Sequence, residues 1–357
     1  MKNRIGYIDI AKAIAILFII IGHLGIVYPS SAVDGGMPPS LERFAFTFHL
    51  PVFFIVSGYF FKPTTPLSWQ FIKKDARSLL LPYLVTSVLI ILICTIVGFF
   101  SETMHASSEF KRWTEAALWG AGSTNPVALW NVERIGGIWF LLAMFWGRVL
   151  IAATAKFSDI ARVAIMLIAL AVGTLSAQHV WLPFSIQSGL GCALYIYIGT
   201  LIRTYDLFSP QKINPLVWVA FILLWGIAII WGGSASLAMC VYPLGVLDII
   251  GGVSACFIIV AFSRFIESHA ATIGRFLQWV GRNTLPIFTL HIVEDNAIPW
   301  GTWGVQLSQA LDGAWFAWIL LLLIRLLIDA ALVAIVYTIP KIREVYFPQL
   351  KKRNVPS

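Results

Sequence analysis

The first apolar stretch of the chain carries three ionisable side chains that could do chemistry. Residues 8–24 read IDIAKAIAILFIIIGHL and include Asp9, Lys12 and His23. An ionisable side chain inside hydrocarbon costs on the order of 2.5–3.5 kcal/mol, so a spanning helix that keeps three of them is expected to line a polar interior. Lys12 and His23 are eleven residues apart, which places them on one helix face about 16 Å apart along the axis. That face offers a cation near one membrane surface and a titratable base near the other.

Asp9 is too far from His23 to orient its imidazole. The two residues are fourteen positions apart, about 21 Å along a helix, whereas a catalytic Asp–His pair is hydrogen-bonded. Asp9 is instead three residues before Lys12, where a local ion pair is expected. Lys12 then either serves as the partner of Asp9 or holds an anion.

Two further histidines fall in apolar segments. His49 lies in FTFHLPVFFIVSGYFF, and a loop of about twenty residues should return it to the membrane depth of His23. Two histidines at one depth favour proton-transfer chemistry, although a hydrogen bond between helices would also explain either residue. His291 lies in GRNTLPIFTLHIVEDN, with Glu294 and Asp295 on the next turn. This segment forms an acid/base cluster or simply reaches the external interface.

Basic residues follow the second apolar stretch. The segment FIKKDARSLLLPYL carries Lys73, Lys74 and Arg77. An ordinary positive-inside loop or a contact with anionic lipids would explain them. Together with Lys12 at a similar depth, they could hold a phosphorylated ligand that arrives from the cytoplasm.

Other charged residues belong to later segments and are weaker site candidates. Glu133 is expected at the external rim, and Arg148 lies deep within the fourth apolar run. Arg325 and Asp329 are four residues apart, and we expect them to be structural partners or to reach the interface.

Transmembrane helices must position these side chains. The chain has 357 residues, of which 59% are hydrophobic and 12% charged, and its mean hydropathy is +0.84. This composition predicts an all-α polytopic membrane protein. About ten apolar runs could span the bilayer. They fall at about 6–28, 46–61, 79–100, 138–154, 162–178, 181–202, 215–232, 240–262, 284–300 and 314–339.

The positions of the basic residues predict an orientation for these spans. With both termini in the cytoplasm, most Lys and Arg residues fall inside, as the positive-inside rule requires. The exceptions are Arg43, Lys111, Arg112 and Arg134. We therefore expect one transmembrane domain over residues 1–340 and a basic cytoplasmic tail over 341–357. The net charge of +8 is then explained by basic residues in cytoplasmic loops, which orient the protein in the membrane. No basic groove for nucleic acid is expected.

Two other features complete the pattern. The largest connection, about residues 101–137, should be external and contains Trp113, Trp119 and Trp130. It is a lid or substrate platform, or it simply lies on the membrane with interfacial tryptophans.

The four cysteines are scattered through apolar runs without a CxxC pair, so neither a disulfide framework nor a metal site is expected.

Several segments, in this order, resemble the acyltransferase-3 family of membrane acyltransferases, particularly its fucose 4-O-acetylase-like branch, which modifies bacterial surface polysaccharides. The resemblance covers most of the chain and about ten helices. Each segment is degenerate alone, and their order and spacing make the resemblance specific. The segments are YIDIAKAIAILFIIIGH, FHLPVFFIVSGYFF, RSLLLPYL, GGIWFLLAMF and GRNTLPIFTLH.

The resemblance implies a function and a set of site residues. The expected function is transfer of an acyl group, usually acetyl, from cytoplasmic acetyl-CoA to a sugar hydroxyl, in the plasma (inner) membrane of a bacterium. His23 matches the essential histidine of the family, and Lys12 stands where the family has arginine. Lysine keeps the charge but loses the bidentate fork. The family's basic pair falls on Lys74 and Arg77, and His49 would assist His23.

The expected partners are a carbohydrate acceptor, which could be lipid-linked, and membrane lipids. The alternative function is a multi-pass transporter that exports a sugar or lipid-linked intermediate without chemistry, because buried charges also mark substrate pathways. A non-catalytic membrane scaffold or sensor is a third possibility. The sequence leaves the acceptor sugar, the acyl chain and the oligomeric state open.

Overall fold

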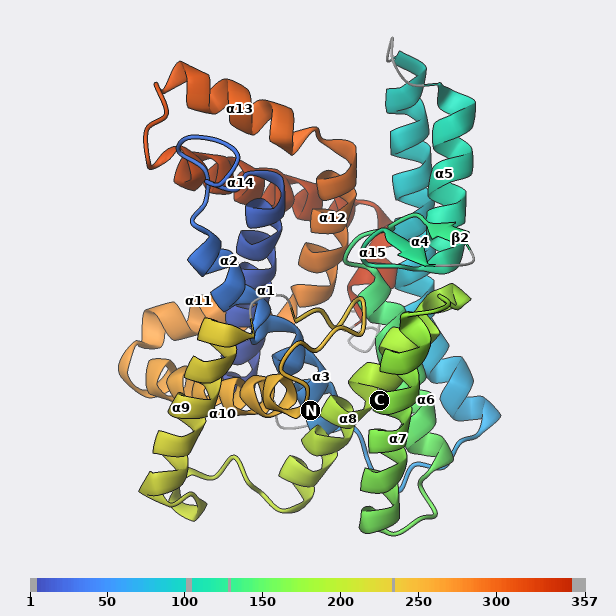
Figure 1. The fold of residues 1–357 in the computed structure, drawn as a ribbon, viewed down its shortest axis with the longest axis vertical. Helices are drawn as coiled ribbons and strands as arrows, with labels where there is room; N and C mark the ends of the chain where they lie inside the picture. The colour runs from blue at the N-terminus through green and yellow to red at the C-terminus, as the bar shows by residue number, and fades with distance from the viewer. Residues whose placement is uncertain (1–4, 101–104, 128–129, 233–234, 349–357) are drawn as a thin grey trace.

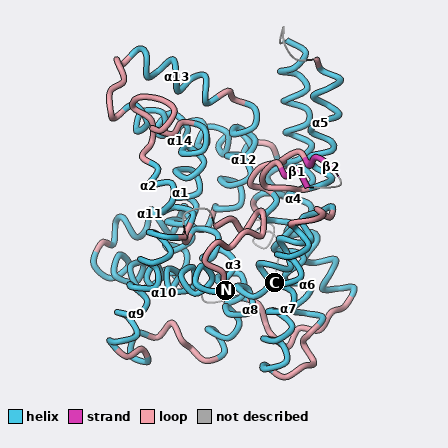
Figure 2. Tube along the Cα trace, viewed as in Figure 1, coloured by secondary structure: helices cyan, strands magenta, loops and turns pink. Residues whose placement is uncertain are grey.

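Helices make up most of the part of the chain that the structure describes (Figure 2). The structure is a computed structural model that describes residues 5–100, 105–127, 130–232 and 235–348. The first helices are α1 (Gly6–Val27), α2 (Pro39–Phe46), α3 (His49–Phe60), α4 (Trp69–Phe100), α5 (Ala106–Trp119), α6 (Trp139–Ala153), α7 (Asp159–Ala177) and α8 (Ile186–Thr204). They are followed by α9 (Pro215–Trp231), α10 (Val246–His269), α11 (Ala271–Arg282), α12 (Thr284–Ala297), α13 (Trp300–Ala310), α14 (Ala317–Thr338) and α15 (Pro340–Tyr346). The short elements are the 3-10 turns η1 (Pro183–Ser185) and η2 (Pro210–Lys212) and the antiparallel strands β1 (Asn125–Val127) and β2 (Trp130–Val132).

The chain is a multi-pass membrane protein by the length and composition of its helices. Seven helical segments of the described chain are long and apolar enough to cross a membrane: α1, α2 with α3, α4, α7, η1 with α8, α10 and α14. α6 and α9 are apolar but shorter. The run predicted at about 284–300 forms α12, whose 14 residues reach only about 21 Å, less than a bilayer core of about 30 Å. The number of ten spans and the cytoplasmic termini therefore stay predictions.

Small residues allow the helices to approach closely. A methyl group on Gly58 of α3 would overlap the carbonyl oxygen of Ile196 of α8, and one on Gly199 would overlap that of Ile55. Such contacts let membrane helices pack backbone to backbone. α1 in turn packs against α2, α3, α10, α11, α12 and α14. Its polar residues are therefore within reach of several other helices.

The long connection around residues 101–137 is folded, in part, into a helix. α5 lies along α4, and the two form an antiparallel pair that extends beyond the neighbouring helices (Figure 1). Trp113 is buried, and its indole nitrogen donates to Glu109 at 3.0 Å. The side chain of Trp130 lies outside the described part of the chain. A role for this connection as a lid or substrate platform stays a prediction.

The segment predicted as a basic tail begins with a docked helix. The hydroxyl of Tyr346 in α15 lies 2.8 Å from Thr86 Oγ1 of α4, and Tyr346 and Phe347 are both buried. These two aromatic residues anchor α15, because burying them removes a large apolar surface from its surroundings. Residues 349–357 of the predicted tail lie outside the described residues.

Candidate active site

His23 lies in the last turns of α1, and 14% of its side chain is exposed. Glycines bring neighbouring elements close to it. A methyl group on Gly22 would come within 3.1 Å of the Phe46 ring of α2, and one on Gly137 would come within 3.3 Å of His23 Cε1. The imidazole is therefore enclosed by packed elements without being sealed off.

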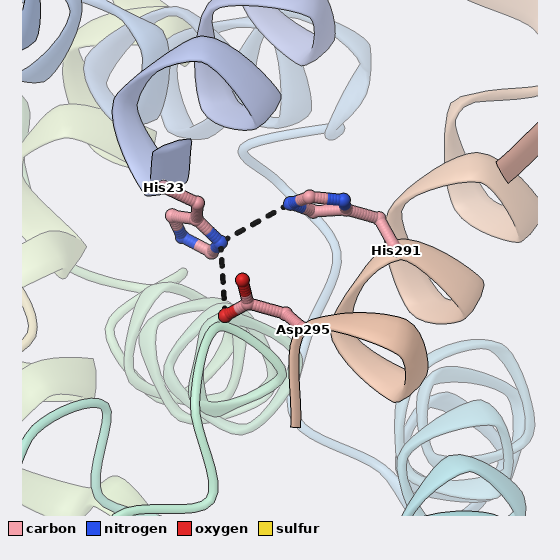
Figure 3. Close-up of side chains that lie close together, drawn as sticks. All are labelled: His23, His291 and Asp295. Carbon is pink, nitrogen blue, oxygen red and sulfur yellow. Dashed lines mark hydrogen bonds and ion pairs between the residues drawn. The ribbon is translucent and has the colours of Figure 1, made fainter. Parts of the chain in front are cut away.

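The direct partners of His23 are two residues of α12 (Figure 3). His23 Nδ1 lies 3.2 Å from Nε2 of His291 and 3.6 Å from Oδ2 of Asp295. Both contacts engage the same ring nitrogen, and no described residue is hydrogen-bonded to His23 Nε2. A histidine held through Nδ1 beside a carboxylate, with Nε2 left over, has the arrangement of a general base or nucleophile.

Two carboxylates hold His291 on its other side. Its Nδ1 lies 2.8 Å from Oε1 of Glu294 and 3.2 Å from Oδ2 of Asp329 on α14. Ionised carboxylates only accept hydrogen bonds, so Nδ1 of His291 must carry a hydrogen. All three side chains are almost completely buried. Glu294 and Asp329 therefore fix the orientation of the His291 ring, and His291 in turn helps to orient His23.

Arg325 of α14 neutralises part of this negative charge. Its Nη2 lies 2.7 Å from Glu294 Oε1 and 2.5 Å from Asp295 Oδ1, so one guanidinium bridges both carboxylates of α12. The indole nitrogen of Trp300 donates to the other oxygen of Glu294, and the guanidinium carbon of Arg325 lies 4.9 Å from the Trp300 ring centroid. Buried charges need such partners, because an unpaired one would be strongly destabilising.

Helical spacing explains how the cluster assembles. His291, Glu294 and Asp295 are at positions i, i+3 and i+4 of α12 and share one face. Arg325 and Asp329 are at i and i+4 of α14, which packs against α12. Arg325 and Asp329 are both buried, and no ion pair joins them to each other among the described residues. The acids and the histidine of α12 lie closer and take both partners.

His49 occupies a different position from the one expected of a direct partner of His23. Its Nδ1 lies 2.6 Å from the carbonyl oxygen of Ala45, to which it donates, and its ring packs edge-on against Phe46. Phe46 also packs on Gly22. His49 is therefore near the end of α1, but within the described chain it makes no hydrogen bond to His23, whose imidazole partner is His291.

At the start of α1, Lys12 and Asp9 form the predicted local ion pair. Lys12 Nζ lies 2.7 Å from Asp9 Oδ1, which confirms the i, i+3 pairing, and Arg282 Nε lies 3.5 Å from the other carboxylate oxygen. Lys74 and Arg77 are exposed on α4. No ion pair or hydrogen bond among the described residues connects them to Lys12.

Glu133 and Arg148 lie outside the His23 cluster. Glu133 Oε2 is 3.4 Å from Arg112 Nε of α5. Arg148 Nη2 is 2.9 Å from Asp75 Oδ1, and its guanidinium lies over the Phe61 ring. Both residues therefore connect neighbouring elements, as structural ion pairs do.

A metal ion is a possible occupant of the cluster on donor types alone. Two triplets have ligand atoms within 4.8 Å of one another: His23 with His291 and Asp295, and His291 with Glu294 and Asp329. Arg325 already bridges Asp295 and Glu294, however. A cation there would sit beside a guanidinium, so a hydrogen-bonded network fits these residues better.

The sequence pattern identified His23 and placed His291, Glu294 and Asp295 in a candidate acid/base cluster, but it did not connect that cluster to His23 and gave Arg325 and Asp329 only a structural role. The signal that could have found them was their residue type. Each is an ionisable side chain in an apolar helix, and such residues in membrane proteins mark functional sites by default.

Comparisons with known proteins give one finding. No curated protein and no solved structure matches the chain significantly. The family model Acyl_transf_3, described as an acyltransferase domain, matches residues 5–339. This match covers nearly the whole chain and includes His23, both of its partners on α12, and Arg325. The chain therefore belongs to the acyltransferase-3 family.

Proposed function

We propose that the chain transfers an acyl group, acetyl in the first instance, from cytoplasmic acyl-CoA to a hydroxyl of a surface polysaccharide or its lipid-linked precursor. This is the function of the fucose 4-O-acetylase-like branch, in the plasma membrane of a bacterium. Family membership supports acyl transfer. The observation that carries the proposal is the imidazole of His23, with Nδ1 turned to His291 and Asp295 and Nε2 without a described partner.

In this mechanism His23 acts as a general base. With its hydrogen on Nδ1, His23 takes the proton of the acceptor hydroxyl on Nε2, and the hydroxyl oxygen attacks the thioester carbonyl carbon. The tetrahedral intermediate collapses with cleavage of the C–S bond, and Nε2–H returns the proton to the thiolate sulfur. The products are the sugar ester and free CoA, so no other reactant is needed.

Asp295 and His291 would stabilise the imidazolium that forms on His23. A carboxylate beside Nδ1 favours the positive charge, as the aspartate of a catalytic triad does. The base must be neutral before each turnover, and the unperturbed pKa of histidine, about 6.5, allows this at pH 7. An acyl-histidine intermediate on Nε2 is the variant of this mechanism in which His23 is a transient acyl carrier, and His49 would then assist proton transfer.

The donor would bind with its phosphates toward the start of α1. Lys12 lies on the same helix as His23, about 16 Å away along the axis, and the extended pantetheine arm of CoA suits such a separation. Lys74 and Arg77 would add charge at the cytoplasmic surface. Lys12 is held by Asp9 at 2.7 Å, so it would act as one member of an ion pair rather than as a free cation.

The test is transfer of radiolabelled acetyl groups from acetyl-CoA by the purified protein. His23→Ala should lower transfer by at least about a hundredfold, because general-base catalysis contributes roughly 10²–10⁴-fold. His105→Ala is the matched control, since His105 is an exposed residue at the start of α5. Retained transfer in His23→Ala would refute the assignment. A wild-type chain that neither transfers nor hydrolyses acetyl-CoA would favour the transporter instead.

The acceptor is identified by a second experiment. Mass spectrometry of surface glycans should show an acetyl group that is lost when the gene is deleted and restored by the wild-type chain. Restoration by His105→Ala but not by His23→Ala would connect the missing group to the site. Restoration by both variants would contradict the proposed function.

A further inference from the structure

A cluster of two arginines and two tyrosines lies at the start of α1, at the end opposite to His23. The guanidinium carbon of Arg264 on α10 is 3.9 Å from the ring centroid of Tyr7. Arg203 of α8 lies 5.0 Å from the ring centroid of Tyr59, and its Nη1 donates to the Tyr59 hydroxyl at 2.9 Å. Tyr7 and Tyr59 interact through their side chains. We call these four residues the two-arginine cluster.

The two-arginine cluster lacks a carboxylate partner. Among the described residues, no Asp or Glu oxygen lies within 4.0 Å of Arg203 or Arg264. Nε of Arg264 is buried without a hydrogen-bond partner. Asp206 acts on Arg264 electrostatically, but its carboxylate is bound to Ser209 at 2.8 Å and to Lys212 at 3.1 Å. Hydrogen bonds from Ser209 and Lys212 lower the pKa of Asp206, so it stays ionised and engaged elsewhere.

Helix ends explain part of this arrangement but not all of it. Tyr59 and Arg203 lie in the last turns of α3 and α8, and Arg264 lies in the last two turns of α10. The C-terminal end of a helix favours a cation, and aromatic rings hold guanidinium groups over their faces. Neither effect satisfies the buried Nε of Arg264, and a buried unpaired donor is costly. An anion bound to both guanidinium groups would supply the negative charge that the described residues do not place there.

We propose that the two-arginine cluster binds a phosphate group, namely the 3′-phosphate of the CoA donor. This inference rests on the proposed function for the identity of the donor. CoA carries a pyrophosphate next to its pantetheine arm and a further phosphate on the ribose, at the end remote from the thioester. Tyr7 is five residues before Lys12 and thus about 7.5 Å farther from His23 along α1. A donor bound with its thioester at His23 would therefore place its pyrophosphate near Lys12 and its distal phosphate near the cluster.

The chemistry of the cluster suits a phosphate dianion. Guanidinium groups bind phosphate through paired, charge-assisted hydrogen bonds. Arg203 is exposed and Arg264 is partly exposed, so both side chains are open to a ligand at the surface of the protein. The two tyrosine rings fix the guanidinium groups in advance, which reduces the entropy lost on binding.

The experiment compares two ligands that differ by one phosphate. CoA and 3′-dephospho-CoA are titrated into the purified full-length chain in detergent, and binding is measured by calorimetry. The wild-type chain should bind CoA at least about tenfold more tightly. Arg203→Gln and Arg264→Gln should lower the affinity for CoA to that for 3′-dephospho-CoA. Arg112→Gln is the matched control, since Arg112 also lies over an aromatic ring, at 5.0 Å from Trp113, but pairs with Glu109 and Glu133.

Conservative variants separate binding from folding. Arg203→Lys and Arg264→Lys keep the charge and should retain an intermediate preference for CoA. Equal affinity of the wild-type chain for both ligands would overturn the proposal, as would an unchanged preference in both Gln variants. A structural role of the arginines would lower the melting temperature of the Gln variants and leave the preference unchanged.

The same phosphate chemistry could come from a lipid headgroup, and this source is tested separately. The titrations are repeated in nanodiscs with and without phosphatidylglycerol. A preference for CoA that persists in both supports the proposal. Anionic lipid that is retained by the wild-type chain and lost in the Gln variants, with no effect on CoA, would assign the cluster to lipid and overturn it. Acyl transfer is assayed apart from binding, so a chain that prefers CoA but transfers nothing refutes the proposed function alone.

Discussion

The two ends of α1 have opposite electrostatic environments. Near Val27, His23 faces a buried cluster of three carboxylates, two of which share the guanidinium of Arg325. Near Gly6, the guanidinium groups of Arg203 and Arg264 lie over tyrosine rings and have no carboxylate within ion-pair distance among the described residues. One helix therefore connects an acidic, proton-binding environment to a basic one.

This difference shows how one helix can serve two chemical tasks. A base that accepts and returns a proton works best beside carboxylates, which stabilise its charged form. A site for anions needs cations without internal partners. If both were close together, the arginines would pair with the carboxylates and each environment would cancel the other. The length of α1 keeps them apart, and the Asp9–Lys12 pair lies between them.

The largest expected effect is on kcat, and it is tested by replacing one aspartate with asparagine at each end of α1. Asp295→Asn keeps the shape of the side chain but removes the charge beside His23 Nδ1, so kcat should fall by at least about a hundredfold. Asp9→Asn releases Lys12 and Arg282 and should lower the KM for acetyl-CoA severalfold, with little change in kcat. Steady-state kinetics with labelled acetyl-CoA measure both. Similar changes in kcat in the two variants would remove the distinction between the ends.

The next largest difference is expected in the free energy of unfolding when one arginine is replaced at each end of α1. Arg325 is completely buried between Glu294 and Asp295, and Arg325→Met would leave two buried carboxylates short of a partner, at a cost of about 3–5 kcal/mol. Arg282 pairs with Asp9 at 3.5 Å with 40% of its side chain exposed, so Arg282→Met should cost at most about 1 kcal/mol. Thermal unfolding in detergent gives the ranking. Equal losses would mean that the carboxylates near His23 are compensated in another way.

The local part of both ends could be predicted from the sequence. Long apolar runs can be recognised in the sequence without knowledge of tertiary contacts, and the structure has a helix at each predicted run. Asp9 and Lys12 are three residues apart on one helix, so their pairing follows from helix geometry alone. His23 was identified for a similar reason, because an ionisable residue in an apolar span is conspicuous without any knowledge of its neighbours.

The tertiary part could not be predicted, because helical spacing does not determine which helices meet. The contact of His23 with His291 joins residues 268 positions apart. Arg325 had a local candidate in Asp329, four residues away, and two distant ones in Glu294 and Asp295. The distant acids are its partners, since α12 presents both on the face that packs against α14. Only the packing of those two helices decides between these choices.

A smaller effect is expected from filling space beside His23. A methyl group on Gly137 would come within 2.6 Å of Ile292 Cδ1 and 3.3 Å of His23 Cε1, so Gly137→Ala should displace the imidazole slightly and lower kcat by roughly tenfold. Gly226→Ala in α9 is the control, because nothing lies within 4 Å of a methyl group there. The KM for acetyl-CoA should stay constant in both, since the donor's phosphates are assigned to the opposite end. A change confined to the KM would contradict that assignment.

The smallest effect should come from removing metal ions, and it tests whether the acidic end works through protons alone. Treatment with a chelator should change acyl transfer less than about twofold, because Arg325 already supplies the cation that bridges Glu294 and Asp295. Metal analysis of the purified protein before and after treatment is the accompanying measurement. A loss of activity that zinc restores would mean that His23, His291 and Asp295 ligate an ion. The end of α1 at His23 would then bind a metal ion. The contrast with the other end would be between a metal site and an arginine site, and no longer between proton transfer and anion binding.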